Sequence, residues 1–175
     1  MTPQEYLQLK AFSRIDGALL ALLWVISFGC YVVGLSNSIY GMVSLLLALA
    51  TPFFVARRLR LFRDQVLGGG ISFLRAYAFS MLTFFYASVL FALVQYVYMA
   101  YLDQGYLLQS MMRIVGSPEG KMLMEGYGLT ARDMESSLTG LAEMRPIDFS
   151  LNVLTANLMV GTFVGIPIAL VMQRK

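Results

Sequence analysis

The sequence predicts an all-α integral membrane protein with four transmembrane helices, cytoplasmic termini and a short helical periplasmic insertion between helices three and four. Three observations lead to this fold class. The 175-residue chain is 58% hydrophobic and only 13% charged, about half the charge of an ordinary soluble domain. Four stretches are long and apolar enough to cross a bilayer. Basic residues are divided unequally between the segments that join these stretches, as expected for membrane proteins.

The spans follow from the length of the charge-free segments. A bilayer core of about 30 Å requires roughly 20 apolar residues in a helix. Four segments without Asp, Glu, Lys or Arg approach or exceed this length: residues 17–35, 39–56, 76–102 and 149–172. We therefore expect residues 1–175 to form one four-span membrane domain, with residues 103–148 as the long connection between the third and fourth spans.

The first helix is expected to begin close to the N-terminus. Thr2, Pro3 and Glu5 have the spacing of a capping box with proline at the first helical position. Asp16 falls at the boundary of the first span. We expect a solvated or arginine-paired carboxylate there, and a proton relay is the less favoured alternative.

Four arginines immediately follow the second span: Arg57, Arg58, Arg60 and Arg63. The favoured interpretation is that they fix the topology of the chain, because basic loops remain on the cytoplasmic side. The alternative is an interfacial helix with Leu59, Phe62 and Val66 on one face, lying on the inner leaflet and attracting anionic lipids. Nucleic acid is not an expected partner, since the basic patch is short and adjoins the bilayer.

The orientation follows from the distribution of charge. The N-terminus, residues 57–75 and the C-terminus together carry nine basic and three acidic residues, whereas residues 103–148 carry four basic and seven acidic ones. Both termini are thus predicted to be cytoplasmic. The expected location is the inner membrane of a bacterium, with the long connection in the periplasm.

Three consecutive glycines, Gly68 to Gly70, separate the arginines from the third span. Glycine sustains a helix poorly, so these residues predict a hinge. The stretch LGGGISFLRAYAFS that contains them resembles a family of small four-helix inner-membrane proteins of Bacteroidetes, classed as a domain of unknown function. The resemblance covers nearly the whole chain and rests on Gly69, Gly70, Ile71, Ser72, Phe73 and Ala76. It implies an architecture and a bacterial host, but no activity.

The last span carries the clearest packing signal. Gly161 and Gly165 form a G-x-x-x-G motif within a stripe of small residues, which predicts close helix packing in lipid. A polar cluster between helices is also predicted, comprising Gln95, Asn152, Thr155 and Asn157. If the third and fourth spans are antiparallel neighbours, Gln95 and Asn157 lie at matching depth and should form a hydrogen bond.

The long connection is expected to form short helices. Ser117 and Thr130 are candidate N-caps, and Met134, Leu138 and Leu141 then recur at helical spacing. This apolar face is a candidate surface for a protein partner. Packing of this face on the protein's own spans is the favoured alternative, because an amphipathic face covers the nearest apolar surface.

These patterns favour a non-enzymatic function. The chain has no histidine, and no catalytic, metal or cofactor motif is present, so none of these sites is expected. We expect an inner-membrane scaffold or accessory subunit of a membrane protein assembly, in contact with anionic lipids and with a membrane protein or a second copy of itself. The alternative is an oligomeric small-solute channel or transporter, although ion-coupled transport usually requires an ionisable group near the midplane.

Overall fold

The structure is a computed structural model that describes residues 2–126, 128 and 130–174. Its elements are α1 (Pro3–Gly34), α2 (Ser38–Val66), α3 (Phe73–Val97), a π-helical turn η1 (Tyr98–Leu102), α4 (Tyr106–Gly116), α5 (Pro118–Gly126), α6 (Ala131–Ala142) and α7 (Pro146–Met172). Outside the helices and turns, the described residues contain one isolated β-bridge, between Ile71 and Arg174. The predicted all-α class is confirmed.

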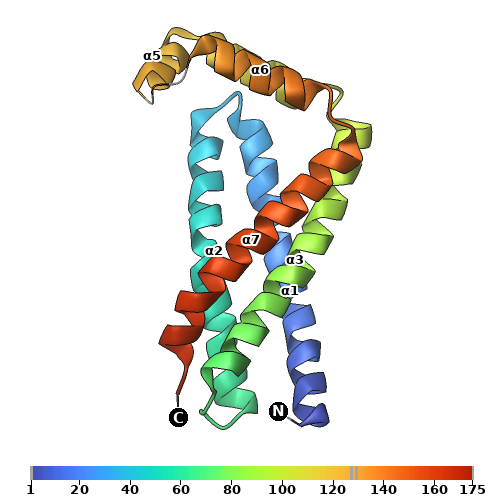
Figure 1. Ribbon diagram of the computed structural model, residues 1–175, viewed down its shortest axis with the longest axis vertical. Helices are drawn as coiled ribbons and strands as arrows, with labels where there is room; N and C mark the ends of the chain where they lie inside the picture. Colours follow the sequence, from blue (N-terminus) through green and yellow to red (C-terminus); the bar gives the residue numbers. More distant parts are fainter. Residues whose placement is uncertain (1, 127, 129, 175) are drawn as a thin grey trace.

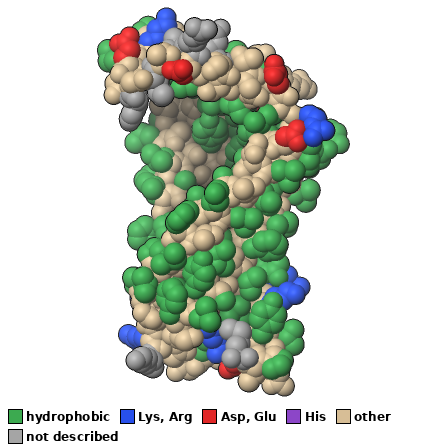
Figure 2. Space-filling view, viewed as in Figure 1, with side chains coloured by type: hydrophobic (Ala, Val, Ile, Leu, Met, Phe, Trp, Pro, Cys, Tyr) green, Lys and Arg blue, Asp and Glu red, His purple; other side chains and the backbone are tan. Residues whose placement is uncertain are grey.

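Four of these helices are long and apolar enough to cross a membrane: α1, α2, α3 continued by η1, and α7. Their apolar side chains cover the middle of the molecule, whereas charged side chains gather toward its two ends (Figure 2). The N- and C-termini lie at the same end, which we call the termini end (Figure 1). The protein therefore has the form of a four-helix membrane protein.

Local sequence signals determine where α1 and α2 begin. The Thr2 hydroxyl accepts a hydrogen bond from the Glu5 amide at 3.3 Å, and the Glu5 carboxylate accepts one from the Thr2 amide at 2.8 Å. The predicted capping box is thus confirmed. At the α1–α2 hairpin, a Cβ on Gly34 would lie 2.6 Å from the Gly41 amide nitrogen. Only glycine permits this close approach of the two helices.

The arginine segment is part of α2, which continues without a break to Val66. The alternative of a separate interfacial helix is therefore wrong. Its apolar stripe is used in a different way, because Leu59 and Phe62 are buried in the core of the bundle. The chain then turns at Gly68 and Gly69, whose φ angles are +70° and +100°, a backbone conformation that favours glycine. These angles confirm the predicted hinge.

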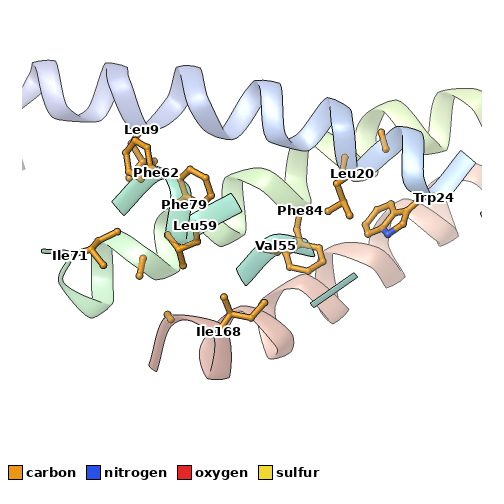
Figure 3. Close-up of a cluster of buried hydrophobic side chains, with 14 of the residues drawn as sticks. Leu9, Leu20, Trp24, Val55, Leu59, Phe62, Ile71, Phe79, Phe84 and Ile168 are labelled. Carbon is orange, nitrogen blue, oxygen red and sulfur yellow. The ribbon is translucent and has the colours of Figure 1, made fainter. Parts of the chain in front are cut away.

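The core lies where α1, α3 and α7 meet the half of α2 nearest the termini (Figure 3). Phe62 of α2 stacks on Phe79 of α3 with ring centroids 4.9 Å apart, and Trp24 of α1 approaches Phe91 of α3 edge-on at 5.6 Å. The other half of α2 remains separated from α7, which crosses the bundle obliquely (Figure 1). This divergence leaves an opening in the side of the bundle.

Helices α4, α5 and α6 form a cap across the end of the bundle opposite the termini (Figure 1). Asp103 supports the start of α4, because its carboxylate accepts hydrogen bonds from the Gly105 and Leu107 amides at 3.1 and 3.0 Å. Thr130 and Asp133 form a second capping box at the start of α6. Hydrogen bonds from Thr130 lower the pKa of Asp133 below its usual value. The predicted short helices of the connection are thus present.

Candidate functional site

The four arginines of α2 occupy different environments. Arg57 and Arg60 are exposed. Arg63 is buried and donates a hydrogen bond to the Met172 carbonyl at 3.1 Å, which ties α2 to the end of α7. Arg58 bonds Asp16 of α1. Two arginines thus fasten helices together, and two remain free to meet the membrane surface.

Asp16 is the most deeply buried charged residue of the spans, with 1% of its surface exposed. The Arg58 Nε donates to its Oδ1 at 2.6 Å, and a guanidinium NH₂ group makes a second, shorter contact with the same oxygen. The arginine-paired carboxylate expected at this position is confirmed. A buried ion pair of this kind holds two helices in register, because either charge alone would be costly in an apolar environment.

The predicted hydrogen bond between Gln95 and Asn157 is absent. Neither the Gln95 Oε1 nor the Asn157 Nδ2 has a hydrogen-bonding partner, although both atoms are buried. The reason is the register of α3 and α7. A Cβ on Gly161 would lie 2.6 Å from the Phe84 Cβ, so these two residues face each other. Asn157 is therefore level with residue 88, seven residues and about 10 Å from Gln95.

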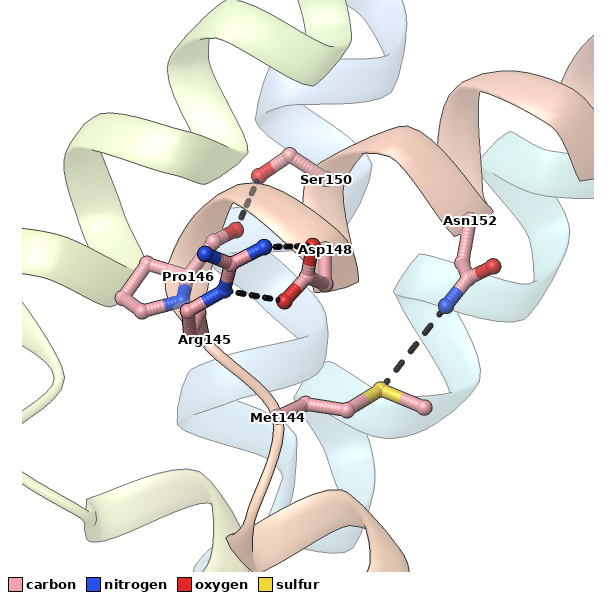
Figure 4. Close-up of polar contacts among 6 residues, drawn as sticks. All are labelled: Met144, Arg145, Pro146, Asp148, Ser150 and Asn152. Carbon is pink, nitrogen blue, oxygen red and sulfur yellow. Dashed lines mark hydrogen bonds and ion pairs between the residues drawn. The ribbon is translucent and has the colours of Figure 1, made fainter.

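The other two residues of the predicted polar cluster have hydrogen-bonding partners other than Gln95. Asn152 is exposed and its Nδ2 points to the Met144 sulfur at 3.7 Å, beside the ion pair of Arg145 and Asp148 at the start of α7 (Figure 4). The Thr155 hydroxyl is exposed and donates to the Leu151 carbonyl of its own helix at 2.9 Å. The four side chains therefore form no single cluster.

The glycines of α7 lie at its contact with α3. Gly161 and Gly165 are both buried. A Cβ on Gly165 would lie 3.3 Å from the Tyr77 ring and 3.6 Å from the Ser80 Cβ. Together with the approach of Gly161 to Phe84, these distances describe a seam in which the absence of side chains lets two backbones come close.

The apolar stripe of α6 is turned toward the protein itself. Leu138 is only 4% exposed, and Met134 is half-buried. Leu141 lines a cavity beneath the cap, together with Leu107 of α4. The sequence proposed this stripe as a surface for a partner, but in this conformation Leu138 is not accessible to one.

One concave feature is the lateral cleft, a cavity of about 500 Å³ between α1, α2, α3 and α7. The surface of the molecule is hollowed below the cap on the side where α2 and α7 diverge (Figure 2). The walls are mainly apolar and include Trp24, Phe84 and Phe91. The Trp24 Nε1 donates to the Thr51 hydroxyl at 3.0 Å, and the unpaired amide of Asn157 belongs to the wall. The described residues that line this cleft include no Asp, Glu, Lys or Arg.

A second cavity, the cap cavity, has a volume of about 240 Å³ and adjoins the lateral cleft. The two share Phe28 and Tyr31 in their walls. The cap cavity is roofed by residues of α4 and α6, and its polar lining includes Gln95 and Asp103. Gln95 is 5% exposed, and its Oε1 lacks a partner. An unpaired buried amide is unusual and marks a place where a ligand could supply the missing hydrogen bond.

Sequence reasoning missed both cavities, as well as the bonds that bridge α1 and α2. Ser27 donates to the Ser44 carbonyl at 3.0 Å, and Trp24 bonds Thr51. Pairs of polar residues at similar distances from the α1–α2 hairpin were a usable signal for these bonds, because an antiparallel hairpin brings such positions together. The cavities had no local signal, since they arise from the angle between α2 and α7.

Comparison with known proteins identifies a family for this chain. No curated protein and no solved structure matches the chain. A family model described as a protein of unknown function, DUF4199, matches residues 16–174. This match covers α1 from residue 16 onward and the whole of α2, the glycine turn, α3, the cap and α7. The chain therefore belongs to the DUF4199 family.

Proposed function

We propose that the protein is a non-enzymatic scaffold or accessory subunit of a membrane protein assembly in the inner membrane of a bacterium, with a Bacteroidetes host expected. Both termini and the arginine segment are assigned to the cytoplasm, and the cap to the periplasm. The nine-to-four division of basic residues supports this orientation. The shared position of the two termini at one end of the bundle is consistent with it.

The observation that carries the subunit proposal is the exposure of large apolar side chains on the cap. Met112 and Ile114 of α4 are each 45% exposed, and Met122 of α5 is 75% exposed. These residues lie beyond the membrane-crossing helices, where lipid tails do not explain their exposure. Methionine is common on surfaces that bind other proteins, because its flexible side chain adapts to the partner.

The charged groups support a structural rather than catalytic role. The described ion pairs within and next to the membrane-crossing helices bridge or stabilise helices: Asp16 with Arg58, Arg63 with Asp64, Glu5 with Arg75, and Arg145 with Asp148. Buried hydroxyls of α3 behave similarly. Ser80, Thr83 and Ser88 each donate to the carbonyl four residues earlier in the same helix. The hydrogen-bonding capacity of these hydroxyls is therefore used within their own helix, which does not favour a polar path for a solute.

Anionic lipids are proposed as partners at the termini end. Arg57 and Arg60 are exposed there and are the members of the arginine segment available to head groups. A basic residue near an anionic surface contributes about 1 kcal/mol to binding. We expect reversal of these two charges to weaken binding to anionic vesicles, whereas Arg58 and Arg63 serve mainly to join helices.

The decisive experiment is native mass spectrometry of the tagged protein purified from its host in mild detergent. The proposal predicts a stoichiometric protein partner that is lost from the Met112→Glu/Met122→Glu variant, while the melting temperature stays within a few degrees of the parent. Ser136→Glu, at another exposed position of the cap, on α6, is the control and should retain the partner. A homo-oligomer without other proteins that conducts a solute in liposomes would overturn the proposal in favour of a channel.

A further inference from the structure

We propose that the lateral cleft and the cap cavity together bind one neutral, single-chain lipid from the bilayer. Its hydrocarbon chain occupies the lateral cleft, and its head group, which carries a hydroxyl, lies in the cap cavity and donates a hydrogen bond to Gln95. This site is separate from the exposed cap residues that carry the subunit proposal.

The size of the cavities favours a lipid chain over a helix from another protein. The lateral cleft has a volume of about 500 Å³, within the range of about 300–1,000 Å³ typical of small-molecule sites, and the adjoining cap cavity adds about 240 Å³. A transmembrane helix about 10 Å wide and 30 Å long occupies roughly 2,400 Å³. The cleft is therefore too small for a helix, but it fits a narrow chain.

The route of access also indicates a ligand from the bilayer. The lateral cleft lies between membrane-crossing helices, and its lining includes Leu49 of α2 and Val160 of α7, which are 59% and 51% exposed. The opening between these two helices faces the side of the bundle (Figure 2). A lipid can thus enter by lateral diffusion, without its chain passing through water.

Gln95 supplies the selectivity that the hydrocarbon walls cannot. A chain that leaves the bilayer for an apolar cleft exchanges one apolar environment for another, so it gains little from the hydrophobic effect. The Gln95 amide is 5% exposed, lines the cap cavity and has an unpaired Oε1. A ligand hydroxyl that donates to this oxygen removes the cost of an unsatisfied buried acceptor.

The charge in the cap cavity decides the class of head group. Among the described residues, Asp103 is the one charged residue in its lining, and a fatty-acid carboxylate would be repelled by it. Its oxygens already accept bonds from the Gly105 and Leu107 amides. A long-chain amine would have to bring its charge past the uncharged walls of the lateral cleft, which is costly. A neutral hydroxyl is not repelled by Asp103, and it brings no charge past the apolar walls of the lateral cleft.

Trp24 provides a direct test, because it is the chain's single tryptophan and it lines the lateral cleft. The purified full-length protein is placed in nanodiscs of saturated phosphatidylcholine and titrated with stearyl alcohol brominated in mid-chain. We expect saturable quenching of the Trp24 fluorescence, reversed by unbrominated stearyl alcohol. Trp24 is only 9% exposed, so bulk lipid should quench it weakly. Brominated stearic acid and a brominated alkane should each bind about tenfold more weakly than the alcohol.

Substitutions in the cleft test whether the quenching of Trp24 arises from lipid bound at this site. Ala48→Phe and, from the opposite wall, Val164→Phe fill the lateral cleft and should abolish saturable quenching. Leu46→Phe, on a position of α2 that is 64% exposed and outside the cleft lining, should leave it unchanged. Gln95→Leu should weaken binding of the alcohol about tenfold, the loss of one hydrogen bond, without affecting the alkane.

Three outcomes would overturn the proposal. The first is quenching that rises linearly with lipid and never saturates. The second is equal quenching in the cleft-filling variants and in Leu46→Phe, which would place the lipid on the outer surface. The third is tighter binding of the acid, the alkane or a long-chain amine than of the alcohol. None of these outcomes bears on the exposed cap residues, so a failure here is distinguishable from a failure of the subunit proposal.

Discussion

Asp16 and Arg58 lie on neighbouring helices, and their burial is unequal. The side chain of Asp16 is 2% exposed, whereas that of Arg58 is 29% exposed. An arginine that loses its partner can extend its long side chain toward the membrane surface. An aspartate that loses its partner remains buried with an uncompensated charge, unless it takes up a proton.

This difference predicts unequal effects of the two single substitutions. Arg58→Leu should lower the free energy of unfolding by about 3–5 kcal/mol, the usual cost of breaking a buried pair, and Asp16→Asn should cost clearly less. The double variant should recover most of the loss caused by Arg58→Leu. Unfolding in mixed micelles measures all three. Equal losses for the two single variants would show that the pair is hydrated rather than buried.

A second prediction at this scale concerns Gln95 and Asn157. Because they lie about two helical turns apart in register and share no hydrogen bond, the effects of Gln95→Leu and Asn157→Leu on unfolding should add to within about 0.5 kcal/mol. Each change should be close to neutral in the lipid-free protein, since a buried unpaired amide stabilises nothing. A coupling energy well above this limit in a double-mutant cycle would mean that the two side chains meet.

At the scale of elements, the seam between α3 and α7 determines the shape of the bundle. Gly161 rests on Phe84, and this contact fixes both the register of the two helices and the place where they cross. The crossing in turn carries α7 away from the outer half of α2 (Figure 1), and the lateral cleft lies between these helices. The cleft is thus a consequence of where two glycines lie in one helix.

Gly161→Ala tests this seam. The added Cβ would lie 2.6 Å from the Phe84 Cβ and 2.7 Å from its Cγ, atoms close to the backbone that cannot easily move. We expect a loss of about 1–3 kcal/mol in unfolding free energy, as for other overpacked positions. Gly29→Ala in α1, where a Cβ meets nothing within 4 Å, is the control and should be neutral or slightly stabilising. Equal stability of both variants would contradict the seam.

The cap offers a test of how its helices pack. Leu138→Glu places a carboxylate at a position that is 4% exposed, so it should lower the melting temperature by several degrees and increase proteolysis of the cap. Ser136→Glu, exposed on the same helix, should change neither. If Leu138→Glu melts like the parent, the apolar face of α6 is free in solution and is again a candidate for a partner.

Elements that depend on neighbours in the sequence were predictable. The four spans follow from charge-free length, the capping boxes from the residues at Thr2 and Thr130, and the turn from Gly68 and Gly69. The register and crossing angle between helices were not predictable from the sequence. The expected match of Gln95 with Asn157 assumed that the ends of the two spans are level, but α7 begins at Pro146 and packs through Gly161. Register and crossing angle are set by contacts between distant residues, and so are the cavities.

At the scale of the whole molecule, the two ends of the bundle differ in chemistry. The termini end holds both chain ends and the arginine segment, joined by the paired backbones of Ile71 and Arg174. The opposite end holds the cap and most of the acidic residues. We propose a bacterial inner membrane for the protein, and there this asymmetry predicts that the arginines are cytoplasmic and the cap is periplasmic. The proposed partner surface on the cap then faces the periplasm.

Cysteine labelling in spheroplasts tests this arrangement most directly. Cys30, the one native cysteine, is replaced by serine, and single cysteines are introduced at Ser72 beside the hinge and at Ser137 on the cap, both exposed positions. A membrane-impermeant maleimide should label Ser137→Cys in intact spheroplasts and label Ser72→Cys only after the membrane is permeabilised. Labelling of Ser72→Cys in intact spheroplasts would contradict the four-span arrangement with a cytoplasmic arginine segment.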